Sequence, residues 1–249
     1  MDLQWAPEKI KHYKQASEYT AFHKKLAVLA QPYLDGGWSL ADIGCGPGLL
    51  SFHLAPMVRH ITAIDNNKLC IGALEAELDR IFYQNRAVAE KIEPRLMDAR
   101  ALGDERWDAI LLAFFGANMD FFEEAFGHAR ERALIYTKAR TQTPGMELLG
   151  AGGECTTPSG TELEAFLNER GYAYKKSAME MQFGQPFKRI EDIHLFLAEV
   201  EGTAGEDAER RAADAEERIV KTNRFDFPYY LPRSVGVTLF IVAMKEAGA

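Results

Sequence analysis

Three glycines at alternate positions, Gly44, Gly46 and Gly48, lie in the stretch LADIGCGPGLL at residues 40–50. They follow a short apolar run that carries one acid, Asp42. Glycine-rich turns of this kind connect a strand to a helix and let a ligand approach the backbone closely. The residues around the turn therefore indicate which ligand it was built to hold.

The spacing argues against two phosphate-binding motifs. A dinucleotide-binding turn has the pattern G-x-G-x-x-G, but the position of its third glycine is occupied here by Leu49. A P-loop needs a lysine followed by serine or threonine after its second glycine, and no lysine follows this turn. The turn is more consistent with a ligand that has a nucleoside but no pyrophosphate than with either phosphate ligand.

Two further acids stand at the ends of the next expected strands. Asp65 lies about twenty residues beyond the first glycine, where a carboxylate can accept hydrogen bonds from both ribose hydroxyls. Asp98 is followed by Ala99, which places a carboxylate and a backbone N–H where an adenine edge would lie. The carboxyl ends of parallel strands form the edge at which open α/β sheets bind ligands, so these groups are expected to converge there.

Strands and helices alternate along the chain around these residues. Because each expected strand is a nearly continuous apolar run, the pattern predicts a parallel sheet covered on both faces. An amphipathic region of one or two helices precedes it at residues 8–34. The expected strands are 39–44, 60–65, 94–98, 107–115, 132–139, 172–183 and 235–246, and the expected helices are 49–58, 67–82, 119–129, 161–171 and 189–200.

About fifty residues separate the last two expected strands, too many for a hairpin loop. We interpret residues 184–234 as an inserted lid or substrate-binding subdomain. The predicted division is a helical cap at 1–37, a core formed by 38–183 and 235–249, and this insertion.

The segments ADIGCGPGLLS, AID and MDAR, at these separations, resemble the class I S-adenosylmethionine-dependent methyltransferase family. The resemblance covers residues 38–140 and extends less closely to the final strand. It implies a doubly wound Rossmann-like α/β fold with a seven-stranded, mostly parallel sheet, N-terminal helices and a lid inserted before the last strand. It also implies S-adenosylmethionine as the cofactor.

The resemblance assigns a role to each matching residue of the cofactor site. The turn would line the methionine and sulfonium portion, Asp65 would bind the ribose, Asn66 would flank the adenine, and Asp98 with Ala99 would read its edge. The end of the fourth strand would offer a carbonyl to the ammonium group, and Tyr13 or Tyr19 would close the site. Cys45 is expected to fill space in the turn and not to act as a nucleophile. The candidate cofactor-binding residues are Asp42, Gly44, Cys45, Gly46, Gly48, Asp65, Asn66, Asp98, Ala99, Ala113, Phe114, Tyr13 and Tyr19.

The net charge and the cysteines of the chain indicate which classes of binding partner and which cellular location to expect. The 249 residues include 37 acids and 29 lysines and arginines, a net charge of −8, which disfavours a nucleic-acid partner. The three cysteines have no metal-binding spacing, so no metal site is expected and a reducing, cytoplasmic location is favoured. No signal peptide or membrane-spanning stretch is visible, and the oligomeric state is not indicated.

Methyl transfer needs alignment of an acceptor more than a catalytic dyad, because the sulfonium is already a good leaving group. The segment after the fourth strand, AFFGANMDFF, lacks the Asn/Asp-Pro-Pro-aromatic signature of amide and amino-purine methylation. It also lacks the acids of metal-dependent catechol methylation and a Pro-Cys nucleophile. These absences favour a small-molecule acceptor. An RNA or protein acceptor, or a non-catalytic cofactor-binding module, remains an alternative.

The candidates for a base or for substrate contact lie in the insertion: His194, Glu191, Tyr229 and Tyr230. His194 could equally be a structural histidine. Four phenylalanines could line an apolar acceptor pocket or could simply pack in the core: Phe114, Phe115, Phe121 and Phe122.

Overall fold

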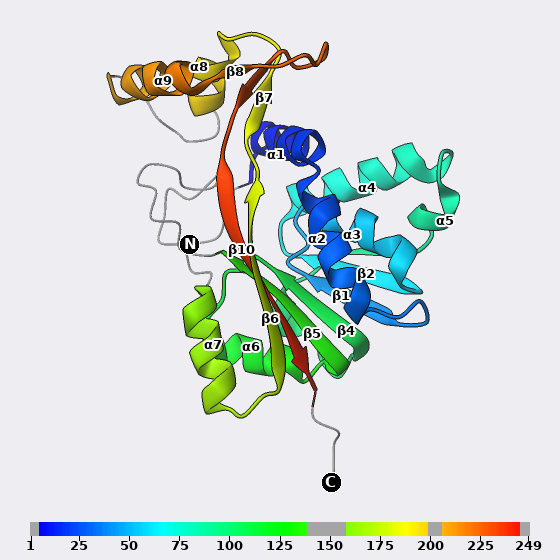
Figure 1. The fold of residues 1–249 in the computed structure, drawn as a ribbon. Coiled ribbons are helices and arrows are strands. Elements are labelled where there is room, and N and C mark those ends of the chain that lie inside the picture. Colours follow the sequence, from blue (N-terminus) through cyan, green and yellow to red (C-terminus); the bar gives the residue numbers. More distant parts are fainter. Residues whose placement is uncertain (1–4, 139–157, 199–205, 245–249) are drawn as a thin grey trace. The chain divides into compact units, whose positions relative to one another are not determined.

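The computed structural model describes residues 5–138, 158–198 and 206–244 (Figure 1). These residues form two compact units. The large unit consists of the described residues within His23–Arg140, Thr156–Met179 and Gly236–Ala249. The small unit consists of those within Met1–Phe22 and Glu180–Val235. No helix in the described part of the chain is long and apolar enough to cross a membrane.

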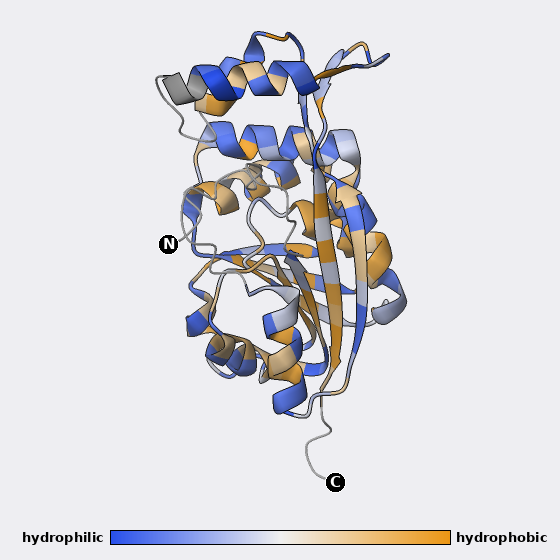
Figure 2. Cartoon of the chain, turned by 60° about the vertical axis from the view of Figure 1, so that its left-hand side comes forward, coloured by the Kyte–Doolittle hydropathy of each residue, from blue (hydrophilic) through white to orange (hydrophobic). Residues whose placement is uncertain are grey.

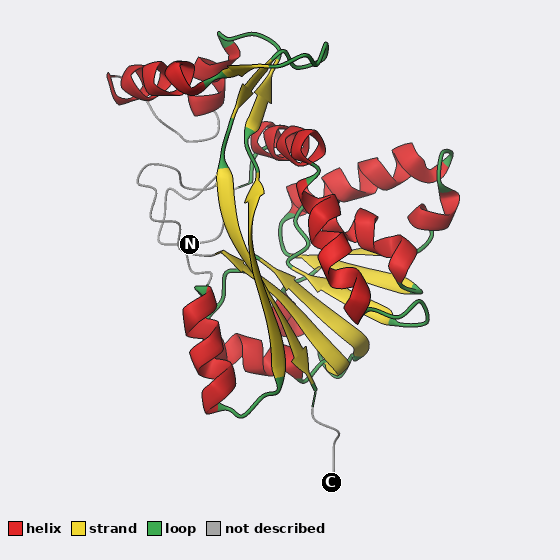
Figure 3. Cartoon of the chain, viewed as in Figure 1, coloured by secondary structure: helices red, strands yellow, loops and turns green. Residues whose placement is uncertain are grey.

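A seven-stranded sheet, in the order β3-β2-β1-β4-β5-β10-β6, forms the centre of the large unit (Figure 3). The pairs among its first five strands are parallel, and β10 is antiparallel to β5. This arrangement confirms the predicted doubly wound, mostly parallel sheet. The strands are β1 (Ser39–Ile43), β2 (His60–Asp65), β3 (Ile92–Leu96), β4 (Trp107–Ala113), β5 (Ala129–Lys138), β6 (Tyr174–Gln182) and β10 (Ser234–Ala243).

Helices cover both faces of this sheet. Figure 1 shows α2, α3 and α4 on one face and α6 and α7 on the other. Central strands such as β1 and β4 are buried along almost their whole length, and Figure 2 shows hydrophobic segments in the middle of the sheet. The helices are α2 (Phe22–Ala30), α3 (Leu49–Leu54), α4 (Lys68–Phe82), α5 (Arg86–Ala89), α6 (Met119–Phe126) and α7 (Gly160–Glu169).

The expected N-terminal helical region is divided in two. Helix α1 (Pro7–Thr20) ends at Ala21, which has a left-handed φ of 54° and donates its N–H to Glu18 and Ser17 carbonyls. Such a C-cap stops one helix and redirects the chain into the next. Because alanine rarely adopts this conformation, the sequence gives little sign of the break.

The small unit contains a three-stranded sheet of order β7-β9-β8 that the sequence did not predict. Its strands, β7 (Gln185–Phe187), β8 (Val220–Lys221) and β9 (Tyr229–Leu231), pair in antiparallel fashion. Helices α8 (Asp192–Phe196) and α9 (Glu206–Arg218) complete the unit with α1. The helix expected over 189–200 begins at Asp192, three residues later than predicted, and residues 199 and 200 lie outside the described part of the chain.

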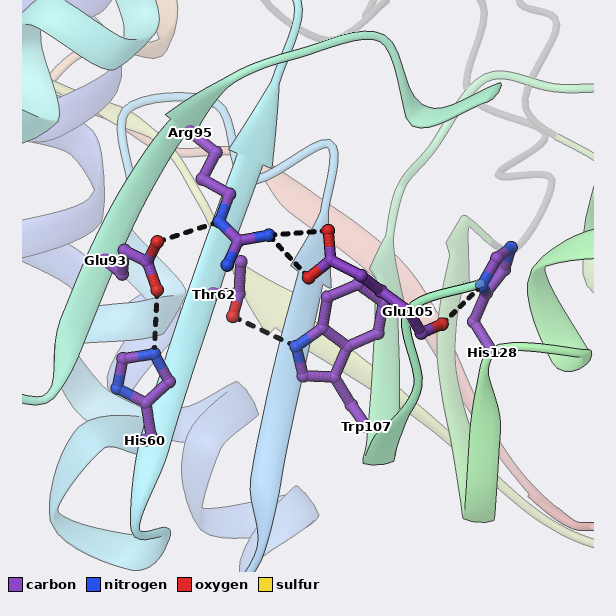
Figure 4. A network of polar contacts seen from close by, with 7 residues as sticks. All are labelled: His60, Thr62, Glu93, Arg95, Glu105, Trp107 and His128. Atoms are coloured by element: carbon purple, nitrogen blue, oxygen red, sulfur yellow. Dashed lines mark hydrogen bonds and ion pairs between the residues drawn. The ribbon is translucent and has the colours of Figure 1, made fainter. Parts of the chain in front are cut away.

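Only a 3-10 turn, Ala99–Ala101, lies in the connection between the parallel strands β3 and β4, where such crossovers usually carry a helix. Charged side chains occupy the adjacent sheet surface (Figure 4). Arg95 donates to Glu93 and Glu105, His60 Nε2 lies 3.2 Å from Glu93 Oε2, and these groups are partly exposed. Beside them the Trp107 indole N–H donates to the buried Thr62 hydroxyl at 3.0 Å.

Candidate functional site

The glycine turn stands where the strand order of the large sheet reverses. β1 pairs with β2 on one side and with β4 on the other, so the chain leaves β1 beside the carboxyl ends of both neighbours. In open α/β sheets this topological switch point is the place where ligands bind. The turn itself has left-handed backbone at each of its three glycines, with φ of 75°, 54° and 73°.

The backbone N–H groups of the turn are directed to the protein itself. Those of Gly44 and Cys45 donate to the Ile64 carbonyl at 2.8 and 2.9 Å, and that of Gly48 donates to the Cys45 carbonyl at 3.0 Å. Gly46 donates to the Asp65 carboxylate at 2.8 Å, and Pro47 has no N–H. A phosphate-binding loop instead points its N–H groups at the ligand, so this turn supplies shape and not a phosphate cradle.

Asp65 is built into the same structure as the turn. One carboxylate oxygen accepts the Gly46 N–H and the other accepts the Asn67 N–H at 2.8 Å. Asn67 in turn caps α4 through bonds from the Leu69 and Cys70 N–H groups. Each carboxylate oxygen accepts more than one hydrogen bond, so this geometry holds Asp65 in a fixed orientation and is compatible with further donors such as hydroxyls.

Asp42, on the strand that precedes the turn, is hydrogen-bonded to the helix that follows the turn. It is 1 % exposed, and the Ser51 hydroxyl of α3 donates to its carboxylate at 2.5 Å. Burial away from water raises the pKa of Asp42 from an ordinary 3.8 to about 7, and the nearby Asp65 charge adds to the effect. Asp42 therefore connects β1 to α3.

Two of the glycines are required by close neighbours as well as by their backbone conformation. A side chain on Gly44 would collide with the ring of Phe115, and one on Gly48 would lie 2.5 Å from Leu74 Cδ1. The ring of Phe115 also stacks on Phe121, with centroids 5.0 Å apart. Phe121 and Phe122 are buried core residues, whereas Phe114 and Phe115 are half-buried.

Phe114 is held in a left-handed conformation, with φ of 56°, directly after the end of β4 at Ala113. This conformation is uncommon for a residue other than glycine, and more so for a bulky one. Its N–H donates to the Tyr136 carbonyl at 2.8 Å and its ring lies 6.3 Å from that of Tyr136. Sequence reasoning missed both this geometry and the contact of Phe115 with Gly44, because no residue pattern signals either.

The predicted adenine-binding residues follow β2 and β3. Asn66 is exposed, and Asp98 is exposed with its carboxylate accepting the Arg100 N–H at 2.9 Å as the cap of a 3-10 turn. Ala99 is partly buried against the core. The Met97 N–H donates to the Asp65 carbonyl at 3.0 Å, which connects the two strand ends. The adenine-binding role of these residues stays a prediction.

The surroundings of the two cysteines near the turn disfavour their thiolate forms. Burial raises the pKa of the Cys45 thiol well above its usual value, and the charges of Asp42 and Asp65 act in the same direction. Burial likewise raises the pKa of Cys70. Both are free thiols. A thiol with a raised pKa is a poor nucleophile, in agreement with a space-filling role for Cys45.

The remaining candidates belong to the small unit. Tyr13 packs edge-on against Phe183, and Tyr19 stacks on Tyr230 with ring centroids 4.8 Å apart. The Tyr230 hydroxyl accepts the Gly184 N–H at 3.2 Å, and burial raises the pKa of this phenol. Tyr229 is half-buried and pairs with Phe187 in the small sheet.

His194 and Glu191 lie on the surface of the small unit. His194 Nε2 is 3.2 Å from Glu216 Oε1, and both side chains are largely exposed. Glu191 is exposed at the start of α8. The structure thus brings together the turn, Asp65 and Phe115 within the large unit, and Tyr19 with Tyr230 within the small unit. Among the described residues, no cluster of three or more His, Cys, Asp or Glu side chains could hold a metal ion.

Comparisons with known proteins identify the fold. No protein-family model matches the sequence, and no curated protein matches it. The BH2331 protein of Bacillus halodurans superposes with a TM-score of 0.58 at 14 % identity, covering 90 % of this chain and 98 % of the other. The cyclase SpnF superposes with a TM-score of 0.56 at 16 % identity, covering 88 % and 80 %.

A third similar structure was solved with a cofactor. Magnesium protoporphyrin IX methyltransferase from Synechocystis, with bound S-adenosylmethionine, has a TM-score of 0.52 and 12 % identity, covering 97 % of this chain and 86 % of the other. Each of the three likenesses covers at least 88 % of this chain. The chain therefore has the Rossmann-like fold of the class I S-adenosylmethionine-dependent methyltransferases.

Proposed function

We propose that this protein is an S-adenosylmethionine-dependent methyltransferase that acts on a small-molecule acceptor. The observation that carries the proposal is the hydrogen bond that connects the glycine turn to the Asp65 carboxylate. The N–H groups of the turn are satisfied by the protein, and one of them fixes the carboxylate of the acid at the end of the next strand. This combination suits a nucleoside that is bound through its ribose and has no pyrophosphate.

The residues present fit this cofactor. Asp65 would accept hydrogen bonds from the ribose hydroxyls, and the turn would allow close approach of the methionine portion because its glycines have no side chains. Asp98 and Ala99 would face the adenine, and the carbonyls of Ala113 and Phe114 would receive the ammonium group. When bound, S-adenosylmethionine supplies a methyl group that is already activated by its sulfonium.

The chain's task is then to align the acceptor and to exclude water. The part-exposed residues next to the turn, Phe114 and Phe115, are apolar. The raised pKa of Tyr230 keeps its phenol protonated near neutral pH, so it would act as a hydrogen-bonding group and not as a base. The other candidates, Glu191, His194 and Tyr229, stay candidates for substrate contact.

A small acceptor is supported by the net charge of −8, which would repel an RNA backbone. Among proteins of similar fold, one is named as a methyltransferase of a porphyrin. The free thiols of Cys45 and Cys70 support a reducing compartment, and a cytoplasmic location is part of this proposal. We also propose that residues 1–37 and 184–234 form the lid over the core.

A second candidate has a specific observation in its favour. The cyclase SpnF superposes on this chain as well as the methyltransferases do, so the fold also accommodates chemistry other than methyl transfer. Incubation with S-adenosylmethionine carrying a labelled methyl group and a library of small acceptors separates the two. Labelled product supports transfer, and tight cofactor binding without any labelled product supports a protein that binds the cofactor for another purpose.

Calorimetry with S-adenosylmethionine and S-adenosylhomocysteine tests the cofactor assignment. We expect the native protein to bind both, and Asp65→Ala to weaken each by about 10- to 100-fold, since hydrogen bonds to a charged group contribute about 1.5–3 kcal/mol. Asp65→Asn retains an acceptor for the Gly46 N–H and should lose less. Asp79→Ala, which removes an exposed acid from α4, is the matched control and should bind normally.

Absence of binding to the native protein would exclude the proposed function. Equal affinities for the native protein and Asp65→Ala would exclude the ribose role of Asp65. Circular dichroism and thermal unfolding of each variant establish that any loss of affinity does not come from a loss of fold.

A further inference from the structure

The geometry at the end of β4 points to a role that the glycine turn alone does not reveal. We propose that the ring of Phe115 contacts the positively charged sulfonium of the cofactor, and that the left-handed backbone of Phe114 is what places the ring there. The proposal rests on the proposed function, because it names a binding residue within that same site.

The position of the ring is the first step. β1 and β4 are neighbours at the switch point of the sheet, and the ligand of an open α/β fold lies between the loops that follow such strands. Gly44 begins the loop after β1, and Phe115 belongs to the loop after β4. The edge of the Phe115 ring lies directly against Gly44, so the ring spans the two loops at the switch point.

The orientation of the ring is the second step. Phe121 stacks against the ring at 5.0 Å with 28° between the planes, so one face of Phe115 is covered. The residue is nevertheless only half-buried. Part of the ring is therefore left uncovered by the core, and the proposal assigns this part to the ligand.

The backbone that holds the ring is strained. Phe114 has a φ of 56°, a conformation that costs a non-glycine residue free energy and persists only when its surroundings impose it. The Phe114 N–H donates to the Tyr136 carbonyl at 2.8 Å, which fixes the end of β4 against β5 just before the strained residue. Tyr136 is fully buried, and its hydroxyl donates to the Leu26 carbonyl at 2.6 Å. The strain is thus located at the residue that sets the direction of Phe115.

The chemistry follows from the ring. An aromatic face attracts a cation, whereas it gives a neutral thioether only ordinary packing. No lysine, arginine, aspartate or glutamate occurs in the segment FFGAN at residues 114–118. Of its two rings, that of Phe114 lies near Tyr136, and that of Phe115 lies against Gly44 of the turn, where it can respond to a charge. Phe115 should therefore favour S-adenosylmethionine, which is charged at sulfur, over S-adenosylhomocysteine, which is not.

The test compares the affinities of the two ligands by calorimetry. For Phe115→Leu we expect the affinity for S-adenosylmethionine to fall about 5-fold or more, with a change of less than about 2-fold for S-adenosylhomocysteine. Leucine keeps an apolar side chain in contact with Gly44 but has no aromatic face. Phe82→Leu, which changes a part-exposed ring at the end of α4, is the control and should alter neither affinity.

Variants of Phe114 test the positioning role. Phe114→Val cannot adopt the left-handed conformation without further strain, because valine is β-branched, and should lose the preference for the charged ligand. Phe114→Gly adopts this conformation readily and should restore the preference. A residue that acts only through packing would not give this pattern, because valine replaces more of the lost ring than glycine does.

Three other outcomes would overturn the inference. Equal losses for the two ligands in Phe115→Leu would reduce the ring to a packing element, and unchanged affinities would remove it from the site. If the native protein binds neither ligand, the proposed function itself fails and this inference fails with it. If the native protein binds both ligands, a negative result with Phe115→Leu overturns only the role of Phe115 and not the proposed function.

Discussion

Among the described acids of the large unit, Asp42 has the carboxyl whose environment differs most from water. It is almost fully buried, accepts a hydrogen bond from Ser51, and has its pKa raised from 3.8 to about 7. Between these two pH values the folded protein binds more protons at this group than the unfolded chain does. The contribution of Asp42 to stability is therefore fully present below pH 3.8 and is lost as the pH rises through 7.

We expect this titration to lower the free energy of unfolding by about 2–3 kcal/mol between pH 5 and pH 8. Asp42→Asn keeps an acceptor for Ser51 but cannot ionise, so its stability should change much less over the same interval. Urea unfolding at both pH values measures the difference. The exposed Asp79→Asn should behave as the native protein does, and a slope unchanged in Asp42→Asn would show that another group is responsible.

At the scale of residues, the sequence predicted the strand-to-helix turn and the acid that follows the next strand, but it did not predict the strain. Gly44, Gly46, Gly48 and Asp65 could be recognised because their types and spacing reflect what a nucleoside ligand requires. The left-handed conformation of Phe114 could not be recognised, because no residue type or spacing in this segment signals it. The same holds for the pKa of Asp42, which depends on burial that the residue type alone does not indicate.

At the scale of elements, a buried hydrogen bond between Trp107 and Thr62 lies next to the short connection between β3 and β4. Trp107 on β4 reaches Thr62 on β2, and β1 lies between these strands. The indole therefore crosses β1, whose Ala41 belongs to the same core cluster and presents only a methyl group. The bond thus joins two strands that are not themselves paired.

Trp107→Phe removes this bond and leaves the Thr62 hydroxyl buried without its donor. We expect a loss of about 1–3 kcal/mol in the free energy of unfolding, beyond that caused by the smaller ring. Adding Thr62→Val to Trp107→Phe removes the orphaned hydroxyl and should recover part of the loss. Denaturant unfolding of both single variants and the double variant gives the coupling energy. Additive effects would mean that the bond contributes nothing measurable.

Long apolar strands were predictable elements, and short ones were not. β1, β2 and β4 are continuous buried runs, which is the pattern that parallel strands produce. β7 and β9 have three residues each and β8 has two, which is too few to show any period. Their pairing depends on contacts within the small unit, so the sequence suggested only an insertion there.

At the scale of the whole molecule, the N-terminal helix and the inserted segment belong to one compact unit. Helix α1 packs on β7, Tyr13 contacts Phe183, and Tyr19 stacks on Tyr230. The His12 ring adds an edge-on contact with Phe196 of α8. Segments separated by more than 160 residues are thus joined by aromatic contacts. If they form the proposed lid, they should respond to the cofactor together.

Hydrogen exchange measured by mass spectrometry tests this cooperative response. S-adenosylhomocysteine at about 100 times its Kd stabilises the bound state by about 2.7 kcal/mol, so amides that open in the free protein should exchange about 100-fold more slowly. We expect this protection in peptides containing the glycine turn and Asp65, and also in α1, β7 and β9. Helix α7, on the opposite face of the large sheet from α3, serves as the internal reference and should not change.

Protection of the turn without protection of α1 and β7 would contradict a lid formed by the small unit. Protection of α1 without protection of β7 would contradict movement of the small unit as one body. The contacts of Tyr13 and Tyr19 would then have to break when the ligand binds.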